Sequence, residues 1–159
     1  MFDSDTARLD SAISDKLVPY EKFSIYDPDK KYGKRKRYPL GTAISVDGNP
    51  NYILLTVTRT ENDDKKAQKV MADDLWKVLS SLWDFNRRSN SMKELYVPAI
   101  ATGFGRSVAN IVTVSKMILL SFYSKSKEEK ISKKLTLVLK SDNKNHLPEI
   151  RYRGINIDS

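Results

Sequence analysis

The chain contains no cysteine and only one histidine, and this scarcity removes several classes of function. Without cysteine there is no disulfide, no thiol nucleophile and no cysteine-ligated zinc. A histidine metal cluster needs more than one histidine, and a Ser-His-Asp hydrolase would have to use His146. His146 lies in the polar stretch 141–146, so we interpret it as a solvated loop residue. The sequence therefore predicts neither a metal site nor a catalytic set.

Long apolar runs are also missing. No run approaches the roughly 20 residues that cross a bilayer. The start of the chain, Met1–Thr6, is acidic and polar, unlike a signal peptide. We therefore expect a cytoplasmic chain, membrane-associated only if the full protein carries a transmembrane region upstream.

What is present is typical of one globular domain. The 159 residues are 40% hydrophobic and 30% charged, and the formal net charge is +8 with a pI near 9.5. Such a charge favours an anionic partner, although simple solubility explains it equally well. We expect a single domain over 1–159, with a variable N-terminal region and basic loop at 1–36, a core at 37–140 and a polar tail or edge strand at 141–159.

Hydrophobic periodicity predicts an α/β fold with a mixed sheet covered by helices on its faces. Strands and helices alternate along the chain. The expected elements are a short helix within 5–18, an extended segment at 23–26, a hairpin of 41–46 and 52–58, a helix from Asp63 or Asp64 to Phe85, a strand at 95–101, a helix at 108–123, a strand at 135–139 and an edge strand or tail at 150–157. The segment 52–58 is too continuously apolar to be exposed on one face, so it is expected inside the sheet.

The stretch that joins the strand at 95–101 to the following helix carries the main functional signal. Thr102-Gly103-Phe104-Gly105 places two glycines between a buried strand and a helix N-terminus. Backbone N–H groups and the positive end of the helix dipole then point at one place, which suits a phosphate. A tight turn that merely lets the helix pack is the alternative. Because ligands bind at the carboxyl ends of such strands, Thr58 and Arg59 are expected there too.

A basic run at 30–38 contains six Lys or Arg residues and two tyrosines. Basic side chains bind phosphates and tyrosines stack on bases, so the run could bind nucleic acid. It could also be a solvated loop, or border the pocket of an anionic ligand. The sequence does not decide among these three.

The motif Val97-Pro-Ala-Ile-Ala-Thr-Gly-Phe-Gly105 resembles the strand and loop of macro domains, which bind ADP-ribose and related nucleotides. The similarity is greater to the macro domain of the bacterial Thoeris anti-phage effector ThsA. That subgroup is similar in Arg37–Thr42, in Tyr52–Thr58, in Leu82-Trp83 and in Gly103–Arg106. The resemblance covers roughly residues 37–140.

The resemblance implies a three-layer α/β/α macro-like fold and a ligand site. It places the diphosphate and its ribose against a loop of Ala101, Thr102, Gly103, Phe104, Gly105 and Arg106. Gly41 and Thr42 match a second glycine position of the subgroup. The first strands of a macro domain, with their adenine-binding Asp and Asn-rich loop, are not found ahead of Pro39. The resemblance therefore implies an N-terminally incomplete fold.

The function implied is a non-catalytic sensor that binds ADP-ribose or a nucleotide derived from it, without a cofactor. A macro-type ADP-ribosyl hydrolase is the enzymatic alternative, with Asp3, Asp5, Asp10 and Asp15 as candidate acids. A nucleic-acid-binding domain is the other alternative, and we rank nucleic acid below a small nucleotide as partner. A homo-oligomer and a membrane-effector region or partner chain outside this sequence are compatible with each function.

Overall fold

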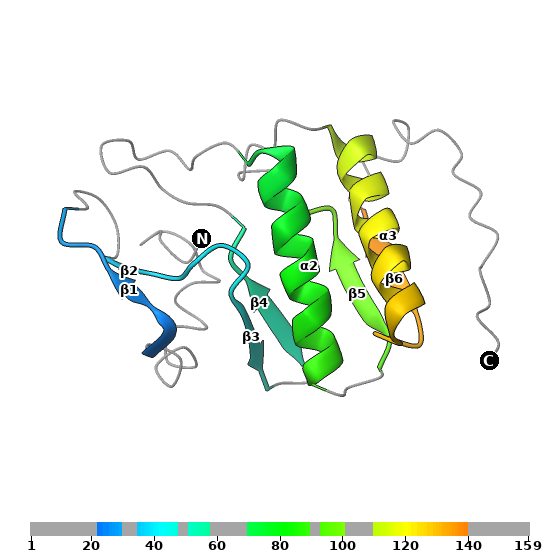
Figure 1. Cartoon of the computed structure of the whole chain (residues 1–159), viewed down its shortest axis with the longest axis horizontal. Coiled ribbons are helices and arrows are strands. Elements are labelled where there is room, and N and C mark those ends of the chain that lie inside the picture. The colour runs from blue at the N-terminus through cyan, green and yellow to red at the C-terminus, as the bar shows by residue number, and fades with distance from the viewer. Residues whose placement is uncertain are drawn as a thin grey trace.

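The computed structural model of the chain describes residues 22–29, 35–47, 51–57, 70–89, 93–100 and 110–139. These residues form a mixed α/β structure, which confirms the predicted class (Figure 1). In chain order the elements are β1 (Ile25–Tyr26), β2 (Lys36–Arg37), β3 (Ala43–Val46), β4 (Tyr52–Leu55), α2 (Ala72–Arg88), β5 (Leu95–Pro98), α3 (Ile111–Glu128) and β6 (Leu135–Val138). The elements predicted at 5–18 and 150–157 lie outside the described residues.

The strands pair in both senses. β3 and β4 form the predicted antiparallel hairpin, in which Ala43 lies opposite Leu55. β5 and β6 pair in parallel, with Leu95 opposite Leu135, so that β5, α3 and β6 form a βαβ unit. The ladders in the described part of the chain are three two-stranded sheets. β4 and β5 therefore meet through the side chains of a shared core, whereas one continuous sheet was expected.

The start of α2 differs from the prediction. A helix from Asp63-Asp64 onward would run through Met71, but the backbone of Met71 is extended, with φ −76° and ψ 156°. Met71 holds the N-cap position without a side-chain cap, and the preceding Val70 is only 3% exposed, within the core. The predicted N-cap is therefore wrong. Val70 forms a β-bridge and Met71 is extended, so α2 is not continuous with the charged residues before them.

The start of α3 also shifts. Asn110 has an extended backbone and its side-chain Oδ1 accepts a hydrogen bond of 2.9 Å from the backbone N–H of Thr113. This is an N-cap, so the helix begins at Ile111 and not at Val108. At its other end α3 continues to Glu128, beyond the predicted Tyr123.

The two helices lie side by side over the strands and share the main core (Figure 1). The apolar stripe predicted for α2 is confirmed, because its five members are at most 4% exposed: Leu75, Val78, Leu79, Leu82 and Trp83. The Trp83 Nε1–H donates a 3.0 Å hydrogen bond to the hydroxyl of Ser121 on α3, and its ring meets Phe122 edge-on at 5.3 Å. The Asn86 Nδ2 donates to the carbonyl of Ile131 at 2.9 Å.

The β3–β4 hairpin makes apolar contacts on both faces, as its sequence predicts. Ile53 and Leu55 pack against the core that α2 covers. Successive residues of a strand point to opposite faces. Accordingly Leu54, with Ile44 and Val46 at 3% and 4% exposure, forms a second cluster on the other face. Both faces of β4 thus make apolar contacts, but among the described residues β4 pairs with β3 alone, so the predicted position inside a larger sheet is not found there.

Candidate functional site

The direction of the strands places a candidate site at one end of the domain. β4, β5 and β6 run the same way and α2 and α3 run back, so the carboxyl ends of the three strands and the N-termini of both helices lie at the top of Figure 1. Ligands of α/β sheets bind at this end, where the loops after the strands meet the positive ends of helix dipoles. We call it the carboxyl end of the domain.

The predicted glycine loop connects two elements at this end. Ala101, Thr102, Gly103, Phe104, Gly105 and Arg106 lie outside the described residues. The residues on either side are described: β5 ends at Pro98, and α3 begins after the Asn110 N-cap. The first turn of α3 contains no acidic residue, so no carboxylate there offsets the helix dipole. The strand–loop–helix order required for a phosphate site is therefore present, and the loop residues remain a prediction.

Gly41 and Thr42 reach the same end because β3 is antiparallel to β4. The backbone N–H of Gly41 donates to the carbonyl of Thr56 at 2.9 Å, and the N–H of Thr56 donates to the carbonyl of Thr42 at 3.0 Å. The N–H of Thr42 donates to Pro39 at 3.1 Å. Both backbone donors are thus engaged within the fold. A ligand contact at these positions would have to use the Gly41 carbonyl or the Thr42 side chain.

The structure gives Gly41 a role in packing. Its φ is +80°, a left-handed conformation that L side chains rarely adopt. A Cβ at this position would lie 2.7 Å from the Ser81 Oγ and 3.0 Å from the Ser81 Cβ on α2. A glycine is required here for close approach of the turn to the helix, whether or not a ligand binds.

Thr58 and Arg59 lie outside the described residues, but the residues before them do not. Thr56, directly after β4, is 5% exposed, and its Oγ1 is buried without a hydrogen-bond partner. Sequence reasoning missed Thr56. The signal was available in the alternation Thr56-Val57-Thr58, which puts two hydroxyls on one face of an otherwise apolar strand just where it ends.

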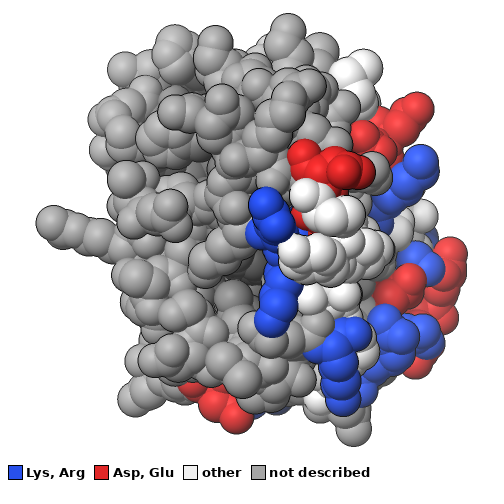
Figure 2. Space-filling model, turned by 90° about the vertical axis from the view of Figure 1, so that its left-hand side faces the viewer, with Lys and Arg blue, Asp and Glu red and all other residues white. Residues whose placement is uncertain are grey.

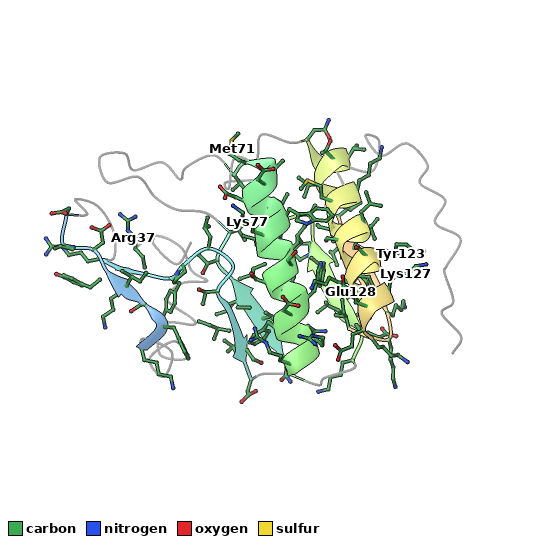
Figure 3. All side chains as sticks on the ribbon, viewed as in Figure 1. Arg37, Met71, Lys77, Tyr123, Lys127 and Glu128 are labelled. Carbon is green, nitrogen blue, oxygen red and sulfur yellow. The ribbon has the colours of Figure 1, made fainter. Side chains whose placement is uncertain are left out.

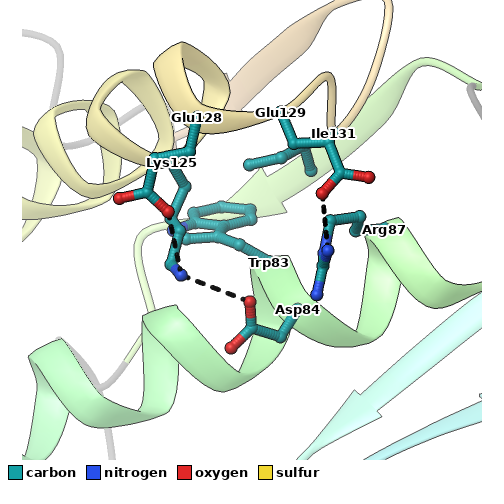
Figure 4. A pocket seen from close by; sticks show the side chains of 7 residues that line it. All are labelled: Trp83, Asp84, Arg87, Lys125, Glu128, Glu129 and Ile131. Carbon is teal, nitrogen blue, oxygen red and sulfur yellow. Dashed lines mark hydrogen bonds and ion pairs between the residues drawn. The ribbon is translucent and has the colours of Figure 1, made fainter.

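A cavity of about 90 Å³ lies between α2 and α3 (Figure 4). It is lined by Trp83, Asp84, Arg87, Lys125, Glu128, Glu129 and Ile131. Lys125 bridges Asp84 and Glu128, each at 3.4 Å, and Arg87 pairs with Glu129 at 2.5 Å. The attraction of Asp84, and then of Glu128, raises the pKa of Lys125 above its usual value, and the hydrogen bond to Glu129 raises the pKa of Arg87.

This cavity is not the nucleotide site. Its volume is far below the roughly 300–1,000 Å³ of ligand pockets. Its lining comes from the last turns of α2 and α3 and from Ile131, opposite the carboxyl end of the domain (Figures 1 and 4). Its charged groups already pair with one another, so we interpret it as the ion-pair clasp that joins the helices.

Metal ligands and membrane spans are two further features on which the described residues bear. Within the described ranges no group of three or more His, Asp or Glu side chains is placed to hold a metal ion. Likewise, none of the helices in that part of the chain is long and apolar enough to span a membrane.

Together, the β3–β4 hairpin, the βαβ unit and the two helices that lie over the strands define a mixed α/β domain. The family profile described as "Thoeris protein ThsA, Macro domain" matches residues 1–140. The chain therefore belongs to the ThsA macro-domain family. The match begins at residue 1, so the likeness is not confined to 37–140. No curated protein matches the chain.

Proposed function

We propose that this domain is a non-catalytic sensor that binds ADP-ribose or a nucleotide derived from it, in Thoeris-type defence of bacteria against phage. The observation that carries the proposal is that the described ends of β4 and β5, the start of α3 and the turn at 41–42 all lie at the carboxyl end of the domain. The predicted segments 58–59 and 101–106 directly follow β4 and β5 in the chain, with two residues between each strand and its segment. Family membership is consistent with this site.

The chemistry of that end suits a diphosphate. The loop at 101–106 would donate backbone N–H groups, and the uncompensated N-terminus of α3 would add a positive partial charge. Arg106 would add a charge-assisted hydrogen bond, which is stronger than a neutral one. The net charge of +8 favours arrival of an anion.

Isothermal titration calorimetry with ADP-ribose, and with its imidazole and histidine conjugates, tests the proposal. We expect saturable binding by at least one of these compounds. Absence of binding at millimolar concentrations of all three would rule it out. The same samples can be assayed for release of ADP-ribose from a modified protein. Release that is lost on changing Asp3, Asp5, Asp10 or Asp15 to Asn would favour the hydrolase.

Gly103→Val provides the sharpest test of the loop. A branched side chain there blocks approach of the backbone to the diphosphate, so we expect binding to be abolished while the domain stays folded. Gly154→Val, in the predicted tail, is the matched control and should bind as the parent does. If Gly103→Val also binds normally, the glycines serve only as a turn.

A further inference from the structure

The β1–β2 ribbon exposes apolar side chains that folding does not explain. We use this name for residues 22–27 and 35–37. Phe23, Ile25 and Tyr26 are 53%, 61% and 59% exposed. Isolated two-stranded ribbons are marginally stable, and a monomer seldom keeps three large apolar residues so close together in water. In Figure 1 the ribbon lies on the far left, away from α3 and β6.

The ribbon is nonetheless built by specific contacts. Asp27 N–H donates to the Arg35 carbonyl at 2.9 Å, and the Asp27 carboxylate pairs with Arg37 at 2.5 Å and accepts from the Asp29 N–H at 3.1 Å. The predicted turn at 27–29 is thereby confirmed. In Figure 3 Arg37, on the ribbon, lies at one end of the molecule, and Tyr123 and Lys127 lie at the other. The contacts hold the exposed side chains in one arrangement.

Cations accompany each exposed ring. The Lys22 Nζ lies 5.1 Å from the centre of the Phe23 ring, and Arg35 Nη1 donates to the Tyr26 hydroxyl at 3.3 Å. In the strand register Tyr26 lies opposite Lys36. The described part of the side that carries the ribbon shows Lys and Arg beside uncharged surface, with Asp and Glu also present (Figure 2). The surface is therefore both basic and aromatic.

From this combination we propose that the β1–β2 ribbon binds single-stranded nucleic acid, with bases stacked on Phe23 and Tyr26 and phosphates held by Lys22, Arg35 and Lys36. Unpaired bases stack on aromatic side chains regardless of their sequence, and basic groups follow the backbone. The activity is independent of nucleotide sensing at the carboxyl end.

An anionic membrane fits the same charge less well. Ile25 and Tyr26 are consecutive in a strand, so their side chains leave the ribbon on opposite faces. A flat bilayer can take up only one face of a ribbon, whereas a flexible strand can contact both. Membrane-binding elements gather their apolar residues on one face.

Fluorescence anisotropy of the full chain with labelled oligothymidine and oligouridine tests the proposal. We expect binding whose affinity falls steeply between about 50 and 200 mM salt. Phe23→Ala and Tyr26→Ala should each weaken it about tenfold, and Arg35→Glu should weaken it and flatten its salt dependence. All three side chains are exposed, so the variants should keep the thermal unfolding of the parent.

Two controls make the result specific. Trp76→Ala removes another exposed aromatic, 43% accessible on α2, and Lys133→Glu reverses another exposed charge, before β6; neither should change the affinity. ADP-ribose titration should be the same for every ribbon variant, which separates this proposal from the sensor function. The proposal is overturned if no oligonucleotide binds, or if the controls lose as much affinity as the ribbon variants. Binding to phosphatidylserine vesicles is measured with the same variants. If the ribbon variants lose only this vesicle binding, the proposal is also overturned.

Discussion

Gly41→Ala tests the packing of the turn at 39–42 against α2 and separates it from a ligand contact. Alanine in the left-handed region costs roughly 1–2 kcal/mol. Its Cβ would also lie 2.7 Å from the Ser81 Oγ and 3.0 Å from the Ser81 Cβ. Overpacking of this kind costs about 1–3 kcal/mol, of which rotation of the serine hydroxyl can relieve only the closer contact. We therefore expect a loss of about 2–4 kcal/mol in the free energy of unfolding, measured by urea denaturation.

The matched variant is Ser81→Ala, which removes the hydroxyl and keeps the Cβ. The Ser81 hydroxyl donates only to the carbonyl of Lys77 within its own helix, so the single change should cost little. In the Ser81→Ala background the cost of Gly41→Ala should fall by about 1 kcal/mol, because the 2.7 Å contact no longer exists. A cost below about 0.5 kcal/mol for Gly41→Ala alone would refute the packing argument. If the folded variant also loses ADP-ribose affinity, Gly41 contacts the ligand as well.

Three further predictions follow from single contacts. Thr56→Val replaces a buried hydroxyl that has no partner by an isosteric methyl, so urea denaturation should show equal or greater stability. If that hydroxyl contacts the ligand, calorimetry should show weaker binding of ADP-ribose by the variant. Unchanged affinity would show that Thr56 is not part of the ligand site. Ser121→Ala should cost about 1–3 kcal/mol by urea denaturation, because the buried Trp83 indole N–H loses its acceptor; a loss no greater than about 0.5 kcal/mol would contradict this. The hydrogen bond from Tyr96 to the Glu94 carboxylate raises the pKa of the phenol above its usual value. Glu94→Gln should lower that pKa, observed as the Tyr96 ¹³Cζ shift in an NMR pH titration, and an unchanged midpoint would show that the contact is not formed.

Periodicity predicted the core of the fold because burial and hydrogen bonding repeat along the chain. The apolar stripe of α2 packs in the core, and the continuously apolar sequence of β4 makes contacts on both faces of the strand. The ends of the helices depend on local events that the pattern does not contain. α2 begins at Ala72 because Met71 is extended after the β-bridge at Val70, and α3 begins at Ile111 because Asn110 caps it.

The basic run shows a different limit of the sequence. Its composition allowed nucleic-acid binding, a solvated loop or a pocket border, and composition alone cannot choose among these. Pairing of Lys36 and Arg37 with Ile25 and Tyr26 is a contact between segments that no short-range pattern encodes. This pairing places Arg35 and Lys36 beside Tyr26, whereas Lys22 is next to Phe23 in the sequence itself.

The polar contacts between α2 and α3 lie at one end of the helices, and the proposed ligand site lies at the other end. The hydrogen bond from Trp83 to Ser121, the bond from Asn86 to the Ile131 carbonyl and the ion pair of Arg87 with Glu129 all lie in the second halves of the helices or just beyond them. The first turns face the carboxyl end, at which β4 and β5 end and from which the predicted loops start. The contacts at one end hold the two helices together. The loops at the other end can therefore change conformation when a ligand binds, because the stability of the fold does not depend on them. Substitutions in the clasp should therefore change unfolding more than affinity, and substitutions in the loops should do the reverse.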